Sequence, residues 1–274
     1  MSTGRGMAQK SLDLIEHSRC ILADILFTRG LIENMGRKCV ANVSRMLVIA
    51  REQRTIPWSW IVDDTRNENY FPKWNGLEDF GERVVSQYRK DFWQRQDSWI
   101  KVFSEKGTIV GIVQPVLAEF AVNYKILHGF GSATSLHDVA EESLTGERYL
   151  EILYIGDFDP SGMHMSEVDL PGRVEKYGGV VDITRIALTS ADCTAALPSF
   201  SVETKRRDPR YAWFKRNYGA RCWELDAMNP NHLRWRLRNE IIQRIDMAAW
   251  EHCRITEKAE RESLNSYIKA WPRS

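Results

Sequence analysis

Cysteine is sparse in this sequence and follows no recognisable spacing. The 274 residues include five cysteines, with no Cys-x-x-Cys pair and no Cys/His spacing typical of a zinc site. A disulfide framework and a structural zinc site are therefore both disfavoured. Free thiols in a reducing compartment fit better, which predicts a cytoplasmic protein.

Long apolar runs and an excess of one charge are also missing. Residues 1–10 lack the apolar centre of a signal peptide, and no run approaches the roughly 20 apolar residues of a membrane-spanning helix. We therefore expect no membrane partner. The 38 lysines and arginines nearly cancel the 37 acids, which argues against a histone-like or tail-driven binder. A local basic face remains compatible with this balance.

Residues 11–55 carry two apolar stripes at helical spacing, with Gly30 as a plausible stop between them. Basic residues surround the second stripe, among them Lys38 and Arg45. Two helices of this kind fit a helix-turn-helix or winged-helix module whose basic residues contact nucleic acid. A plain helical hairpin with a solvated basic face fits the same pattern.

Short apolar strands alternate with helices from residue 98 onward, after a charged helical stretch at 77–95. We expect strands at 99–104, 124–128, 149–155, 180–187 and 221–225, and helices at 108–122, 163–177 and 230–250, with another ending at Ala140. Such alternation predicts βαβ units and a mainly parallel sheet. The fold class is therefore α/β, with a helical module and connector at 1–97 and the α/β domain with C-terminal helices at 98–274.

Acidic residues follow two of the expected strands. Glu105 comes directly after the first, and Asp157 and Asp159 follow the strand at 149–155. Functional groups of open α/β sheets gather at the carboxyl ends of the strands, so these three acids would meet if the two strands are neighbours. Crowded carboxylates require a cation or a proton between them, and Mg²⁺ suits such a set.

Two other interpretations of the Asp-x-Asp pair stay open. Asp159 followed by Pro160 is also a favourable helix start, with aspartate as the N-cap and proline at the first position. A phosphatase of the dehalogenase type also uses Asp-x-Asp, but it expects Thr or Val where Ser161 stands.

Taken together, Glu105 at a strand end, the GFGS at 129–132 and the GDFDPSG at 156–162 resemble the Toprim domain. They are most similar to the Toprim domain in the DNA-cleaving subunit of topoisomerase VI and in its stand-alone bacterial and phage relatives. The segments 30–34, 56–63, 185–189 and 224–228 also look like those relatives. The resemblance extends from about Leu22 to Trp250.

The resemblance implies a winged-helix-like module followed by a Rossmann-like Toprim domain that acts on nucleic-acid phosphodiesters, with DNA favoured over RNA. It implies that Glu105, Asp157 and Asp159 are the catalytic residues and hold Mg²⁺, with Mn²⁺ as an alternative. Glu105 would serve as a ligand or as a general acid/base. Related subunits pair, so a homodimer is expected.

One departure concerns the tyrosine nucleophile of the topoisomerase subunit. The corresponding stretch at 21–26 contains no tyrosine, and the first tyrosine of the chain is Tyr70. Metal-dependent hydrolysis is therefore the leading hypothesis. A topoisomerase-like transesterase, and a non-catalytic DNA-binding or regulatory protein that keeps the fold, are the alternatives.

Several basic residues are candidates for phosphate contacts, although solvated faces also explain them: Lys106 beside Glu105, Arg185 at a strand end, and Lys205 and Arg207 in a basic run. Glu224 and Asp226 follow another expected strand and would extend the acidic cluster, unless they only precede the helix that begins near Pro230. His164 is a candidate neighbour of the metal site, or a packing residue.

Overall fold

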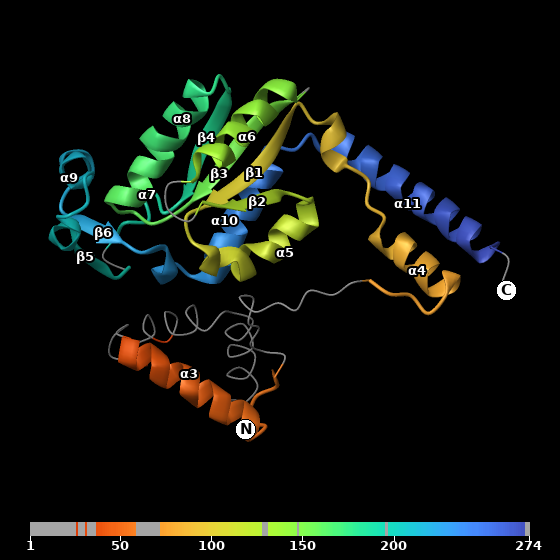
Figure 1. Cartoon of the computed structure of the whole chain (residues 1–274), viewed down its shortest axis with the longest axis horizontal. Helices are drawn as coiled ribbons and strands as arrows, with labels where there is room; N and C mark the ends of the chain where they lie inside the picture. Colours follow the sequence, from red (N-terminus) through yellow and green to blue (C-terminus); the bar gives the residue numbers. More distant parts are fainter. Residues whose placement is uncertain are drawn as a thin grey trace.

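The computed structural model describes residues 26, 31, 37–58, 72–127, 131–146, 148–194 and 197–271. Its centre is a four-stranded parallel sheet in the order β2-β1-β3-β4 (Figure 1). The strands are β1 (Ser98–Ser104), β2 (Asn123–Ile126), β3 (Tyr149–Ile155) and β4 (Val181–Ala187). The α/β class and the parallel sheet predicted from the sequence are confirmed.

The two central strands are buried along most of their length because both faces of the sheet are covered. In β3, Ile152 and Tyr154 pack toward one face, whereas Leu153 and Ile155 pack toward the other. This alternation follows from the two-residue period of an extended chain. β1 and β3 run side by side, with Ser104 opposite Ile155.

Helices cover both faces of the sheet (Figure 1). One face carries α6 (Ala133–Thr145), α7 (Pro160–His164), the π-turn η4 (Met165–Asp169) and α8 (Leu170–Lys176). The other carries the short turn η3 (Gly107–Ile109), α5 (Val110–Phe120) and α10 (Pro230–Ile242). Because β1 and β3 are paired up to Ser104 and Ile155, the loops that follow them meet at the carboxyl ends of the strands.

A small antiparallel ribbon lies beside this edge of the sheet. It consists of β5 (Ser199–Ser201) and β6 (Arg221–Trp223), with η5 (Val202–Lys205) and α9 (Tyr211–Tyr218) between them and η6 (Leu225–Ala227) after them. The expected strand at 221–225 therefore ends at Trp223 and pairs with β5 outside the parallel sheet. The sequence patterns indicated neither β5 nor α9, since both are short.

The single helix expected at 230–250 is wrong, because the chain forms two helices there. α10 ends at Ile242, and α11 (Met247–Lys269) begins after Asp246. The Asp246 carboxylate caps α11 by accepting from the N–H groups of Ala248 at 2.8 Å and Ala249 at 3.2 Å. The Gln96 side chain also bonds the Asp246 backbone in both directions, at 2.7 and 3.2 Å, and these bonds fix the corner.

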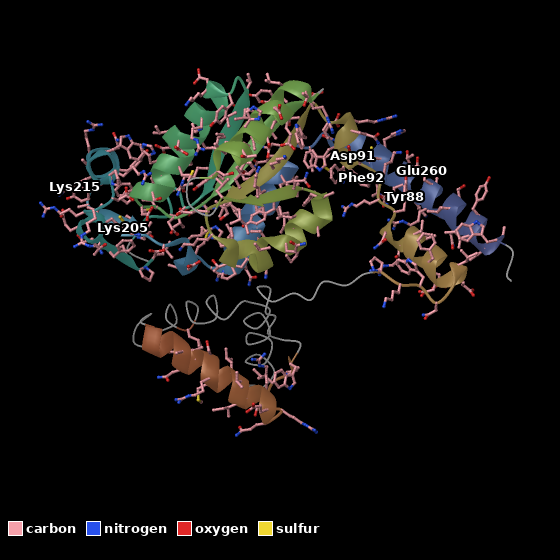
Figure 2. All side chains as sticks on the ribbon, in the orientation of Figure 1. Tyr88, Asp91, Phe92, Lys205, Lys215 and Glu260 are labelled. Atoms are coloured by element: carbon pink, nitrogen blue, oxygen red, sulfur yellow. The ribbon has the colours of Figure 1, made fainter. Side chains whose placement is uncertain are left out.

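The stretch expected to be helical at 77–95 is also divided, into α4 (Leu77–Gln87) and η2 (Phe92–Arg95). Both pack against α11 (Figure 2). Tyr88 donates to Glu260 at 2.5 Å, and Lys90 pairs with the same carboxylate at 2.9 Å. β1 begins at Ser98, one residue after the predicted domain boundary, which stays a prediction.

The second of the two helices expected within 11–55 corresponds to α3 (Arg37–Glu52). The first of them and the connector at 59–71 lie outside the described residues, so the winged-helix module stays a prediction. None of the helices within the described part of the chain is long and apolar enough to cross a membrane.

Candidate functional site

Glu105 lies beside the Asp-x-Asp loop because β1 and β3 are parallel neighbours. The pair Ser104 and Ile155 closes their register, so the next residues of both strands leave the sheet together. Glu105 and Asp157 therefore stand at one edge of the sheet, which is the arrangement that the sequence argument required.

The Asp-x-Asp loop is held in place by Arg185 of β4. Its guanidinium group donates five hydrogen bonds, which go to the loop, to the helical turns after it and to the residue that follows β4. The acceptors are the carbonyl oxygens of Gly156, Asp157, Gly162 and Leu188 and the hydroxyl of Ser166. Arginine has five N–H donors, and this set engages all of them. A phosphate contact by Arg185 stays a prediction that would require one of these bonds to open.

The tight turn into α7 requires glycine at position 162. A Cβ atom there would collide with the carbonyl oxygen of Asp157. The N–H of Gly162 donates to Asp159 Oδ1 at 2.8 Å, so Asp159 is the N-cap of α7, with Pro160 at the first helical position. The capping interpretation is therefore confirmed.

Capping occupies only one oxygen of Asp159. The other, Oδ2, lies 3.1 Å from the ammonium group of Lys205, and the Asp159 side chain is almost fully buried. Lys205 belongs to η5 of the small ribbon. One carboxylate thus begins a helix and also takes part in a charged cluster.

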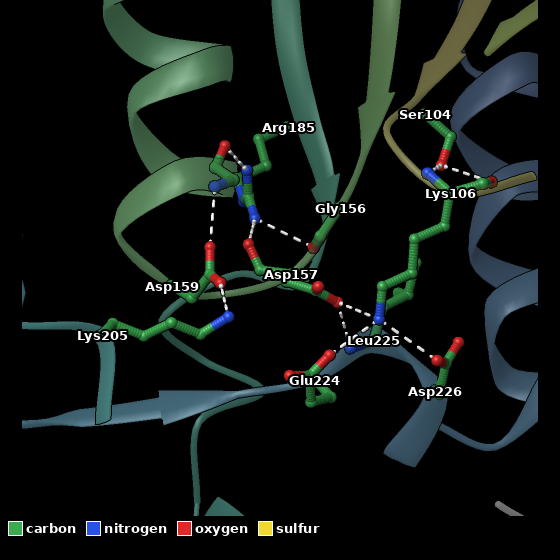
Figure 3. Close-up of polar contacts among 11 residues, drawn as sticks. Ser104, Lys106, Gly156, Asp157, Asp159, Arg185, Lys205, Glu224, Leu225 and Asp226 are labelled. Carbon is green, nitrogen blue, oxygen red and sulfur yellow. Dashed lines mark hydrogen bonds and ion pairs between the residues drawn. The ribbon is translucent and has the colours of Figure 1, made fainter. Parts of the chain in front are cut away.

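Asp157, the first acid of the loop, contacts the segment that follows β6 (Figure 3). Asp157 Oδ1 accepts from the N–H of Leu225 at 2.7 Å and lies 3.1 Å from Lys106 Nζ. The same ammonium group contacts Glu224 at 2.7 Å and Asp226 at 3.1 Å. The structure therefore brings these two weaker candidates into the acidic cluster.

Burial dominates the ionisation of the acids at the strand ends. It raises the pKa of Asp157 to about 7, against the opposing effect of Lys106 and the Leu225 N–H. Burial, followed by the nearby charge of Asp159, also raises the pKa of Glu105. Both groups hold a proton more readily than ordinary surface carboxyls.

The pKa values of Lys106 and Lys205 are raised, although burial alone would lower them. Burial opposes the charged form of Lys106, but the charges of Asp157, Asp226 and Glu224 raise its pKa well above the usual range. Burial would also raise the pKa of Glu224, yet the charge and hydrogen bond of Lys106 hold it below its usual value. The ammonium group of Lys106 is therefore a permanent charge within the cluster.

The carboxylates of this cluster are the kind of ligand that a hard divalent cation prefers. Five carboxylates gather around two ammonium groups, and carboxylate oxygens are the ligands that Mg²⁺ and Mn²⁺ prefer. They are Glu105, Asp157, Asp159, Glu224 and Asp226, with Lys106 and Lys205 as the ammonium groups.

The spacing of these acids is set by the lysines. In the described chain, the one group of three potential ligands with ligand atoms within 4.8 Å of one another is His137, Asp138 and Glu141, on an exposed face of α6. Asp157 is instead drawn to Lys106, and Asp159 to Lys205. A cation shared by the loop acids would therefore have to draw them together.

The remaining candidate residues have no contact with this cluster among the interactions described above. Arg207 is exposed after η5, and Arg45 is exposed on α3. Lys38 belongs to α3, but its side chain lies outside what the structure describes. The ring of His164 packs edge-on against Trp213, with centroids 5.1 Å apart, so it serves in packing.

The sequence carries a local signal for Glu224 and Asp226 as site residues. They repeat the Asp-x-Asp spacing as Glu-x-Asp after a short strand, which is the same signal that identified the loop after β3. That signal alone does not say which strand ends meet. The backbone bridge between Phe158 and Trp223 decides it, because it joins the loop to β6.

No protein-family model matches this chain, and no curated protein matches it either. The Toprim resemblance therefore stays a prediction.

Proposed function

We propose that this chain is a metal-dependent nuclease of the Toprim type that hydrolyses nucleic-acid phosphodiesters, with DNA as the favoured substrate. The observation that carries the proposal is the meeting of Glu105 and the Asp157 loop at the carboxyl ends of two adjacent parallel strands. The motif resemblance assigns catalytic roles to the same residues.

Glu105, Asp157 and Asp159 would hold Mg²⁺ or Mn²⁺. The ion, when bound, would neutralise charge on the scissile phosphate and stabilise the leaving oxygen. Glu105 would serve either as a ligand of the ion or as the general acid/base that exchanges a proton with the attacking water or the leaving oxygen. Arg185 keeps the backbone of the loop in a fixed position during these steps.

Positive charge on the small ribbon supports nucleic acid as the substrate. Lys205 contacts Asp159 of the cluster, and Arg207, two residues later, is exposed. Such residues position a phosphodiester backbone without reading its sequence. Arg45 on α3 would provide a second contact if the N-terminal module is of the winged-helix type.

The proposed reaction type, oligomeric state and compartment rest on the sequence and on its resemblance to the Toprim proteins. Hydrolysis is preferred to a covalent protein–DNA link because residues 21–26 contain no tyrosine. A homodimer would place two acidic clusters across a duplex. We place the reaction in the reducing cytoplasm, in agreement with the free Cys39, Cys193, Cys222 and Cys253.

The decisive experiment incubates purified protein with supercoiled plasmid and with short labelled DNA and RNA, in Mg²⁺ or Mn²⁺. Glu105→Gln, Asp157→Asn and Asp159→Asn are compared with Asp182→Asn, an exposed aspartate on β4. The Asp159→Asn change retains a good helix cap, so a lost activity cannot be assigned to a broken α7.

We expect metal-dependent cleavage by the parent protein and by Asp182→Asn, and a loss of at least about 100-fold in the three site variants. Each sample is split with and without protease before electrophoresis. Product that enters the gel only after protease would support the transesterase instead. Binding without cleavage, unchanged in the site variants, would support a non-catalytic DNA-binding protein.

A further inference from the structure

The ammonium group of Lys106 has an unusual environment for an ion pair. It contacts three carboxylates at once: Asp157 and Asp226 at 3.1 Å each and Glu224 at 2.7 Å. These acids come from two segments, the loop after β3 and the segment after β6 (Figure 3). The Lys106 side chain is only 24% exposed.

Lys106 is anchored at its backbone as well as at its charge. Its N–H donates to Ser104 Oγ at 3.1 Å, and its carbonyl accepts from Tyr124 at 3.3 Å. The side chain therefore extends from a fixed point into the cluster. Its ammonium group is the shared partner of the three carboxylates.

Two other lysines near this sheet, Lys205 and Lys101, differ from Lys106 in the number of carboxylates that they contact. Lys205 contacts the single carboxylate of Asp159 and is 38% exposed. Lys101 of β1 pairs with the single carboxylate of Glu142. Both are ordinary ion pairs, whereas Lys106 collects three acids that would repel one another without it.

We propose that Lys106 is a positioning residue that fills a second cation position, so that the site takes one divalent ion where its acids alone would take two. This inference rests on the proposed function, since it assumes a first ion on Glu105, Asp157 and Asp159. Lys106 keeps Glu224 and Asp226 away from that ion and holds one oxygen of Asp157 toward the ribbon.

The distances support an ammonium group rather than a metal at this position. The three Nζ–O separations of 2.7–3.1 Å are those of charge-assisted hydrogen bonds. Mg²⁺ binds oxygen at about 2.0–2.1 Å, so the ammonium group and an ion cannot share the position. Removal of the ammonium group leaves three carboxylates that a divalent ion can draw together.

The experiment counts bound Mn²⁺ on the intact protein by equilibrium dialysis and by the electron paramagnetic resonance signal of free Mn²⁺. The variants are Lys106→Met, Lys106→Arg and, as a matched control, Lys101→Met. We expect one ion in the wild type, in Lys106→Arg and in Lys101→Met, and two in Lys106→Met. Asp226→Asn added to Lys106→Met should return the count to one.

A second measurement leaves Lys106 in place and does not depend on the folding of Lys106→Met. Glu224→Gln and Asp226→Asn should each retain the wild-type count, whereas Asp159→Asn should lose it. An equal count in Lys106→Met and the wild type, or two ions in the wild type, would overturn the inference. Loss of the ion in Glu224→Gln or Asp226→Asn would also overturn it.

Failure of the proposed function gives a different result. A wild type that binds no Mn²⁺ would count against the metal-dependent nuclease. The same result would remove the first ion that the inference assumes. A wild type that binds one ion while Lys106→Met also binds one would overturn the inference alone and leave the proposed function standing.

Discussion

Phe158 and Trp223 exchange both of their backbone hydrogen bonds, at 2.9 and 3.0 Å, although 65 positions separate them in the chain. Phe158 is the middle residue of the Asp-x-Asp loop, and Trp223 is the last residue of β6. This antiparallel bridge carries Glu224 and Asp226 to the acids after β3. The charged cluster therefore depends on a backbone contact between two short segments.

Trp223→Pro tests this bridge. Proline removes the N–H that donates to Phe158, whereas Trp223→Ala retains it while losing the same aromatic ring. We expect Trp223→Pro to be less stable than Trp223→Ala by about 1–3 kcal/mol, from the lost bond and an unsatisfied carbonyl. Urea unfolding of both variants measures the difference, and equal stabilities would show that the bridge contributes little.

Arg185→Met should destabilise the protein strongly. The substitution leaves four buried or part-buried carbonyl oxygens without the donors that Arg185 supplies. We expect a loss of roughly 3 kcal/mol or more in the free energy of unfolding. Arg254→Met is the control, because Arg254 pairs with Glu251 on the exposed surface of α11. The prediction fails if both variants unfold at the same urea concentration.

Asp192 should make the protein sensitive to acid. Burial favours its protonated form, but the hydrogen bonds from Arg236, at 2.6 Å to each oxygen, and from Thr189 hold its pKa below the usual value. A lowered pKa contributes stability above the unfolded value of about 3.9, and this is lost as the pH falls through the folded value.

Asp192→Asn tests this dependence on pH. The stability difference between the wild type and the variant should be largest near neutral pH and should shrink below about pH 4. Urea unfolding at pH 7 and at pH 3 measures it. A difference that is the same at both values would contradict the assignment of the shift to Asp192.

Cys222 should resist alkylation in the native protein. Its side chain is fully buried in β6, and burial raises the pKa of the thiol to about 12. The thiolate is the reactive species, so little of it exists at pH 8. Iodoacetamide labelling followed by peptide mapping should find Cys222 modified in urea and protected in buffer. Rapid labelling in buffer would mean that the ribbon opens readily.

Arg207→Gln should weaken nucleic-acid binding in a way that depends on salt. Arg207 is exposed two residues after Lys205, which contacts Asp159, so we expect it to neutralise one phosphate. Loss of that contact should reduce the slope of log K against log salt by about 1. Titrations of labelled DNA at several salt concentrations measure it, with Arg254→Gln as a control. An unchanged slope would remove Arg207 from the interface.

Much of the sheet and of the central site could be predicted from local patterns. β3 has the predicted bounds of 149–155, because a short apolar run with a flanking acid is visible without any knowledge of the fold. The sequence predicted that Glu105 and Asp157 would meet if their strands were neighbours, and the pairing of β1 with β3 meets that condition. The Asp159 cap was also visible, since capping depends on residues only three positions apart.

The tertiary structure decided the features that depend on distant partners. The corner between α10 and α11 has a local signal in the Asp246 cap, but the bonds that anchor it come from Gln96, 150 positions away. Lys106 looked like a phosphate contact or a solvated residue, and only the fold places Glu224 and Asp226 around its ammonium group. Periodicity and capping act over a few residues, and so the sequence alone shows them. Charge clusters form wherever the chain returns to the same place, and only the packed structure determines where that is.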